Sequence, residues 1–221
     1  MKRLLSTLFI LAAIAYFASA QDNNNRFSIG ISGGINSNMN AYRFEANTYG
    51  NEFINGDKLF NIGLDFGIMA TQKLRPRIEF KYVKMNYSAD WVNTGFTTNK
   101  ESVVTLFNIN TTLHLDYLML NKGKLQFFIS PGVKWEFNYD REVKNIKTDG
   151  TYNYNNYNNI INECPENILG GTVTAIVKYN IYKGIGITLA PEYTMFFTKF
   201  DTGNDKPYQR VSANIGVEFK F

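Results

Sequence analysis

The stretch Phe107-Asn108-Ile109-Asn110-Thr111-Thr112-Leu113-His114-Leu115-Asp116-Tyr117 decides the fold of this chain. Its odd positions are apolar or aromatic apart from one threonine, and its even positions are all polar. A period of two places these two sets of side chains on opposite faces of a β-strand. A tilted strand needs about 9 to 11 residues to cross the hydrocarbon layer of a membrane, so this stretch is long enough to span one.

The same alternation recurs along the whole chain. We predict eight strands, at residues 27–35, 60–68, 77–82, 107–117, 125–139, 169–179, 185–197 and 210–221. The connections alternate between short ones, near 71–74, 121–124 and 180–183, and long ones, near 36–58, 88–100, 140–167 and 200–207. Short periplasmic turns and long extracellular loops are typical of outer-membrane barrels. The pattern predicts an all-β fold, an eight-stranded antiparallel up-and-down transmembrane β-barrel with both termini in the periplasm.

The first twenty residues have the features of a secretory signal peptide. Lys2 and Arg3 precede an apolar segment at 4–17, and Ala18-Ser19-Ala20 is a small-residue cleavage site. We expect cleavage after Ala20, so that residues 1–20 are the signal peptide and residues 21–221 the barrel domain. An uncleaved anchor is the alternative.

The bulk composition excludes several classes of protein. Aromatic residues make up 15% of the chain, yet the mean hydropathy is only -0.25, as expected when an apolar face is balanced by a polar one. The net charge of +4 is spread along the chain, which gives no support to nucleic-acid binding. The single cysteine, Cys164, excludes an internal disulfide and a cysteine-based zinc site. We expect no cofactor.

The polar faces of the predicted strands carry most of the charge. Ten ionisable side chains share that face: Arg77, Glu79, Lys81, His114, Asp116, Lys134, Glu136, Glu192, Arg210 and Glu218. Eight strands enclose an interior barely wide enough for side chains, so we expect paired charges and small residues there, and no bulky aromatics. We therefore predict that these charges form a structural salt-bridge plug that fills the barrel. A low-conductance pore through the barrel is the alternative. If the apolar face were not lipid-facing, the chain would be a periplasmic β-sandwich.

Two further features bear on function. His114 and Asp116 lie two residues apart on the inward face, and a histidine oriented by a carboxylate would suit a lipid-modifying enzyme. Such an enzyme needs its histidine at the lipid-facing surface, so we predict no catalysis. The Asn/Tyr-rich segment 151–162 provides adaptable contact surface for an extracellular protein partner, or is simply a polar loop.

The chain resembles the OmpX/OmpA-type barrels and, more closely, the PorT-like outer-membrane β-barrel family. The glycine-rich opening Ile29-Gly30-Ile31-Ser32-Gly33-Gly34-Ile35-Asn36 and the strand Arg75-Pro76-Arg77-Ile78-Glu79-Phe80-Lys81-Tyr82 carry that resemblance. The terminal Phe219 and Phe221 look like the signal that barrel-assembly machinery reads. The resemblance implies an outer-membrane location, contact with membrane lipid and lipopolysaccharide, and either envelope structure or, for PorT-like members, a secretion-system partner.

Overall fold

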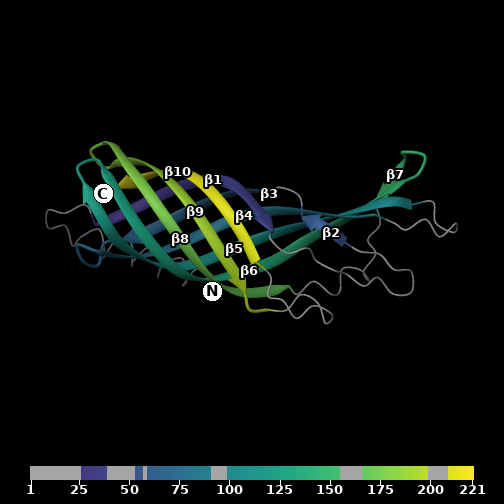
Figure 1. Ribbon diagram of the computed structural model, residues 1–221, viewed down its shortest axis with the longest axis horizontal. Helices are drawn as coiled ribbons and strands as arrows, with labels where there is room; N and C mark the ends of the chain where they lie inside the picture. The colour runs from purple at the N-terminus through teal and green to yellow at the C-terminus, as the bar shows by residue number, and fades with distance from the viewer. Residues whose placement is uncertain (1–25, 39–52, 57–58, 91–98, 155–165, 199–208) are drawn as a thin grey trace, which may run out of the picture.

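Eight strands close into a barrel in the computed structural model, which describes residues 26–38, 53–56, 59–90, 99–154, 166–198 and 209–221. The barrel strands are β1 (Phe27–Asn38), β3 (Leu59–Ile68), β4 (Leu74–Asp90), β5 (Asn99–Lys122), β6 (Leu125–Lys147), β8 (Asn167–Tyr182), β9 (Ile185–Phe196) and β10 (Gln209–Lys220). Each pairs antiparallel with the next barrel strand in the chain, and β1 pairs with β10 to close the ring (Figure 1). The predicted all-β, eight-stranded antiparallel up-and-down barrel is confirmed.

Three tight connections lie at one end of the barrel, which we call the short-turn end. They join β3 to β4, β5 to β6, and β8 to β9. Gly123 and Gly184 have φ values of 56° and 75°, a left-handed conformation that glycine adopts without strain. The predicted short connections are therefore present, and the opposite end is called the long-loop end below.

At the long-loop end, the sheet continues beyond the barrel. Strands β4, β5 and β6 have 17, 24 and 23 residues, about twice what a membrane crossing requires. The short strands β2 (Phe53–Gly56) and β7 (Tyr152–Tyr154) pair with β4 and β6 there. We call this region, residues 53–56, 86–90, 99–106, 140–147 and 152–154, the extension sheet; it lies at the right of Figure 1.

The extension sheet corrects the predicted loops. Residues 88–90, 99–100 and 140–147 were expected in connections, but they continue strands β4, β5 and β6. The segment Asp140-Arg141-Glu142-Val143-Lys144 carries charge at successive positions, so it shows no period of two. Strand pairing outside a membrane does not require one apolar face, which explains why the alternation missed it.

The two faces of the barrel differ as predicted. Large apolar side chains point outward and stay exposed, as at Phe60 (74%), Ile215 (62%) and Leu113 (60%). The alternate positions point into the barrel, where polar and charged side chains are buried. In the part of the chain that the structure describes, no helix is long and apolar enough to cross a membrane.

The expectation that bulky aromatics do not fit the interior is wrong. Seven large apolar side chains are buried at inward positions: Val83, Met85, Leu106, Phe128, Ile168, Ile176 and Phe196. The guanidinium of Arg75 lies 4.8 Å from the centre of the Phe128 ring, and that of Arg210 lies 5.0 Å from the centre of the Phe196 ring. A flat guanidinium stacks on an aromatic face, so charge and ring share a narrow space.

Several sequence predictions concern residues outside those that the structure describes. They include the signal peptide at 1–20, most of the Asn/Tyr-rich segment, and Cys164. Five aromatic side chains are exposed on the outer face toward the long-loop end: Tyr82, Trp135, Tyr139, Tyr193 and Phe197.

Gly132 allows β5 and β6 to approach each other closely. A Cβ at this position would lie 2.7 Å from the Leu113 carbonyl oxygen and 2.9 Å from His114 Nδ1. We expect Gly132→Ala to lower the free energy of unfolding by about 1–3 kcal/mol through overpacking, measured by urea unfolding in lipid vesicles. Gly33→Ala is the control, because its Cβ would meet only the Asn61 carbonyl oxygen at 3.5 Å. Equal effects of the two changes would contradict this account.

Candidate functional site

A continuous set of ion pairs fills the barrel interior from the short-turn end. Lys178 pairs with Glu218, and Glu218 Oε2 accepts from Arg75 Nη1 at 2.6 Å. Arg75 Nη2 lies 2.7 Å from Asp116 Oδ2, and Arg77 Nε lies 3.1 Å from the same oxygen. These five side chains come from β4, β5, β8 and β10, so the network ties together strands far apart in the sequence.

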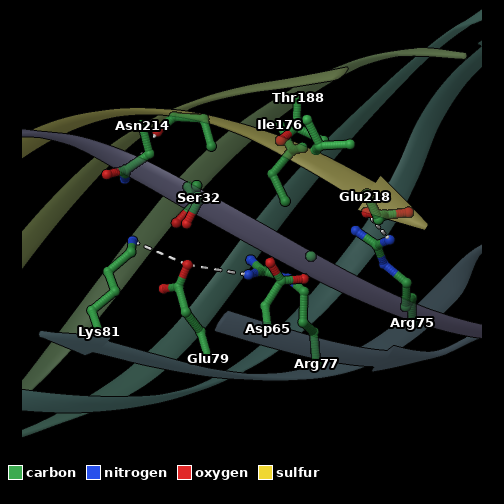
Figure 2. A pocket seen from close by; sticks show the side chains of 14 residues that line it. Ser32, Asp65, Arg75, Arg77, Glu79, Lys81, Ile176, Thr188, Asn214 and Glu218 are labelled. Atoms are coloured by element: carbon green, nitrogen blue, oxygen red, sulfur yellow. Dashed lines mark hydrogen bonds and ion pairs between the residues drawn. The ribbon is translucent and has the colours of Figure 1, made fainter. Parts of the chain in front are cut away.

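The network continues toward the long-loop end through Glu79. Its Oε1 lies 3.5 Å from Arg77 Nη1 and 3.0 Å from Lys81 Nζ. Lys81 Nζ lies 3.8 Å from Glu192 Oε2, and Lys134 donates to the same carboxylate. Figure 2 shows Lys81, Glu79 and Arg77 in sequence, with the Arg75–Glu218 pair beyond them. We call the whole set the lumen network: Arg75, Arg77, Glu79, Lys81, His114, Asp116, Lys134, Lys178, Glu192 and Glu218.

Asp116 has three donor residues around its carboxylate. It is fully buried, and it accepts from Arg75 Nε at 2.8 Å and from the Ser130 hydroxyl at 2.5 Å, besides the Arg77 contact. A buried carboxylate without partners would be strongly unfavourable, and three donors offset that cost here.

A second ion pair lies apart from the lumen network. Arg210 donates two hydrogen bonds to Glu136, from Nη1 at 2.7 Å and from Nη2 at 3.1 Å. Asn108 donates a third to Glu136 at 2.9 Å. Arg210 also lies against Met85 and Phe196, two of the buried apolar side chains. This bidentate ion pair, covered by the Met85 and Phe196 side chains, lies in the barrel interior near the long-loop end.

All ten sequence-predicted site residues lie on the lumen face, and each is buried. The structure brings eight of them into the lumen network and places Glu136 and Arg210 in the second pair. Sequence reasoning missed Arg75, Lys178 and Asp65. Their parity was the available signal, since Arg75 lies two residues before Arg77 and the other two lie at polar positions of alternating runs.

The interior charges are nearly balanced. Among the described residues, six buried cations (Arg75, Arg77, Lys81, Lys134, Lys178 and Arg210) face five buried carboxylates (Glu79, Asp116, Glu136, Glu192 and Glu218). Asp65 is half-buried and lines the same cavity, which provides a sixth carboxylate. Near neutrality of a buried charge set avoids a large desolvation cost, so the arrangement suits a structural plug.

His114 forms a serine–histidine–carboxylate arrangement. Its Nδ1 lies 3.1 Å from Ser130 Oγ, and its Nε2 lies 3.4 Å from Glu79 Oε2. Nucleophilic catalysis requires a substrate to reach the hydroxyl. Ser130 is fully buried, its proton is donated to Asp116, and the interior cavity is lined by neither Ser130 nor His114. The arrangement therefore holds Ser130 and His114 in place in the barrel interior.

Glu79, His114 and Glu192 also offer ligand atoms within 4.8 Å of one another. Each of the two carboxylates already forms an ion pair with an ammonium group: Glu79 with Lys81, and Glu192 with Lys134. A metal ion would have to displace both lysines or share the space with their positive charge. The donor set fits ion pairs better than a metal.

A cavity of about 30 Å³ remains between the network residues, lined by Asp65, Arg75, Arg77, Glu79 and Glu218 among others (Figure 2). This is room for about one water molecule. At this level of the barrel, the described side chains therefore leave a small cavity and no wide channel.

The small cavity predicts very low conductance. In planar bilayers we expect the wild-type barrel to give no porin-sized current steps. Replacing Arg77 and Glu79 together by serine removes one charge of each sign and two long side chains, so we expect small steps to appear. Large steps from the wild type would contradict a sealed lumen.

Among the comparisons with known proteins, the solved structures bear on the architecture. No protein-family model matches the chain, and no curated protein matches its sequence. The outer membrane protein OprG from Pseudomonas aeruginosa is 15% identical, with a TM-score of 0.51 over 89% of this chain and 96% of that one. Neisserial surface protein A is 11% identical, with a TM-score of 0.47 over 91% and 100% of the two chains. The similarity to OprG shows the fold of a small outer-membrane β-barrel, and the PorT-like resemblance stays a prediction.

Proposed function

We propose that this protein is a non-enzymatic outer-membrane barrel that serves as a rigid anchor for a surface-exposed sheet. The polarity of the closed barrel is the observation that carries the proposal. Its outer face exposes large apolar side chains on all eight barrel strands, while most of the charges of these strands are inside. Lys84, toward the long-loop end of β4, is an exception on the outer face. Soluble proteins rarely expose apolar patches beyond a few hundred Å², whereas lipid solvates such a face at no cost.

The small cavity among the network side chains supports an anchoring role over a transport role. The lumen network joins six of the eight barrel strands, β4, β5, β6, β8, β9 and β10, and a cavity of about 30 Å³ lies among its side chains. Cross-linking by buried ion pairs makes the barrel rigid, since breaking one pair exposes an unpaired charge. A rigid barrel holds the extension sheet at a fixed angle to the membrane.

Both ends of the barrel sequence meet at the short-turn end. Phe27 and Phe221 exchange two backbone hydrogen bonds, of 3.2 and 2.9 Å. The expected orientation puts this end in the periplasm and the extension sheet outside the cell. The side chains of Phe219 and Phe221 are 37% and 60% exposed in the folded barrel, and we expect them to form the signal that the assembly machinery reads.

The extension sheet is the surface offered to an extracellular partner. Tyr152 and Tyr154 are 58% and 64% exposed, and their ring centres lie 5.7 Å apart in an edge-on arrangement. Lys144 Nζ lies 4.2 Å from the Tyr152 ring centre, so a cation holds that ring in place. Rigid exposed tyrosines provide contact area at small entropic cost.

Cysteine labelling on intact cells tests the location and the orientation together. In a Cys164→Ser background, Asn153→Cys marks β7 and Lys183→Cys marks the short-turn end. We expect a membrane-impermeant maleimide to label position 153 on whole cells and position 183 only after the outer membrane is opened. Labelling of neither site in the membrane fraction, or the reverse order, would overturn the proposal.

A further inference from the structure

Among the described residues, the exposed side-chain charges at the short-turn end are all positive. Lys73 lies between β3 and β4, Lys122 and Lys124 flank Gly123, and Lys183 lies between β8 and β9. All four lysines are exposed, and among the described residues none forms an ion pair with a carboxylate. Residues 69–74, 118–125 and 180–185 contain no aspartate or glutamate. A single sign of charge on three separate turns forms one cationic rim.

The opposite end of the barrel is mixed in sign. Exposed acidic residues there, such as Glu142 and Asp149, lie among lysines of β5 and β6. The net charge of +4 for the whole chain therefore does not explain the rim. The excess of positive charge is therefore specific to the short-turn end of the barrel.

Large apolar side chains adjoin these lysines. Next to Lys122 lie Met119 and Leu120, 58% and 39% exposed, and Ile181 and Tyr182 beside Lys183 are 51% and 71% exposed. A lysine beside lipid-facing apolar groups places its ammonium in the headgroup plane. A phospholipid meets both features at once, since its chains cover the apolar groups and its phosphate reaches the cation. A soluble anion would use only the charge.

A vestibule of about 990 Å³ opens at the same end, lined by Arg26, Lys73 and Lys220 with no carboxylate. Amide side chains complete the lining at Gln72, Asn121 and Gln126, and Lys220 donates to Gln126 Oε1 at 3.4 Å. Amide N–H groups and ammonium groups are the donors that a phosphate oxygen requires. The vestibule therefore provides hydrogen-bond donors that can bind a phospholipid headgroup next to the rim lysines.

We propose that the short-turn rim, Lys73, Lys122, Lys124 and Lys183 with the vestibule, selectively binds anionic phospholipid headgroups. The inference rests on the membrane location proposed above. Each lysine near an anionic lipid surface favours the charged lipid by roughly fivefold. Several lysines on one rim thus enrich anionic lipid around the barrel and fix the depth of its short-turn end.

Nanodiscs and native mass spectrometry test this selectivity. The barrel is reconstituted in phosphatidylcholine mixed with phosphatidylglycerol, and the lipids that stay bound are counted. We expect the wild type to retain phosphatidylglycerol at least roughly fivefold over its share in the disc, given the effect of a single lysine. The triple variant Lys122→Gln, Lys124→Gln, Lys183→Gln should lose most of that enrichment. The matched control Lys100→Gln, Lys144→Gln, Lys147→Gln removes the same charge at the other end and should keep it.

The outcomes separate the two proposals. A barrel that fails to insert into discs of phosphatidylcholine alone contradicts the membrane location. A barrel that inserts but shows no enrichment, or loses it equally in the control variant, overturns lipid selectivity. A competition experiment adds soluble glycerophosphate to the loaded discs. If glycerophosphate displaces the bound phosphatidylglycerol, the site recognises a free anion and the lipid proposal is wrong. A heat-modified gel shift confirms that each variant is folded.

Discussion

Replacing Ile215 by arginine should lower the free energy of unfolding of the bilayer-inserted barrel by about 2–4 kcal/mol. Ile215 lies at the middle of β10, between Gly33 on β1 and Leu189 on β9, and its side chain is 62% exposed on the outer face. In a membrane this position faces hydrocarbon, where a guanidinium loses its hydration. In water, the same change would replace an exposed apolar side chain with a soluble one and cost almost nothing.

Urea unfolding from phosphatidylcholine vesicles measures the effect. Val211→Arg is the matched control, because Val211 lies on the same strand and face, nearer the long-loop end, and is 40% exposed. An arginine there reaches the interface, so we expect a cost of about 0–1 kcal/mol. If both variants were as stable as the wild type, the outer face would be wet and the membrane assignment would fail.

Glu136→Gln should lower the free energy of unfolding by about 3–5 kcal/mol. The change keeps the shape of the side chain but removes the charge that accepts two hydrogen bonds from Arg210 and one from Asn108. Arg210 is 1% exposed, so its guanidinium would stay buried without a counter-charge. The effect comes from that stranded charge more than from the lost bonds.

Two further variants isolate this cause. Glu142→Gln removes an exposed carboxylate of the same strand and should change stability by less than about 0.5 kcal/mol. Glu136→Leu combined with Arg210→Met removes both charges, and we expect it to recover most of the loss, since apolar replacements of similar volume are tolerated where a pair was buried. A loss for Glu136→Gln no larger than for Glu142→Gln would mean that water reaches the second pair.

The strands and their two faces were readable from local sequence. Each barrel strand shows alternation over enough residues to predict its face, and the short turns at Gly123 and Gly184 carry the glycine that a left-handed turn requires. The prediction failed where alternation stops being necessary. Outside the membrane, the backbone of segment 140–147 pairs with β5 without an alternating pattern, and its charged residues gave the appearance of a loop.

The side chains that fill the barrel interior could be predicted only in part from the sequence. Arg75 has the same parity as Arg77, but the alternating run that was used to predict the inward charges began at Arg77 and left Arg75 out. Phe128 and Phe196 occupy inward positions because guanidinium groups stack on them, an arrangement that no local pattern signals.

The sequence by itself determined which side chains share a face of each strand, because the side of a strand depends only on neighbours one and two residues away. Only the tertiary structure decided which charges meet. Arg75 and Glu218 are 143 positions apart, and Arg210 and Glu136 are 74 apart. Their pairing depends on the register of every strand between them and on the closure of β1 onto β10. The same closure gathers three separate turns into one cationic rim.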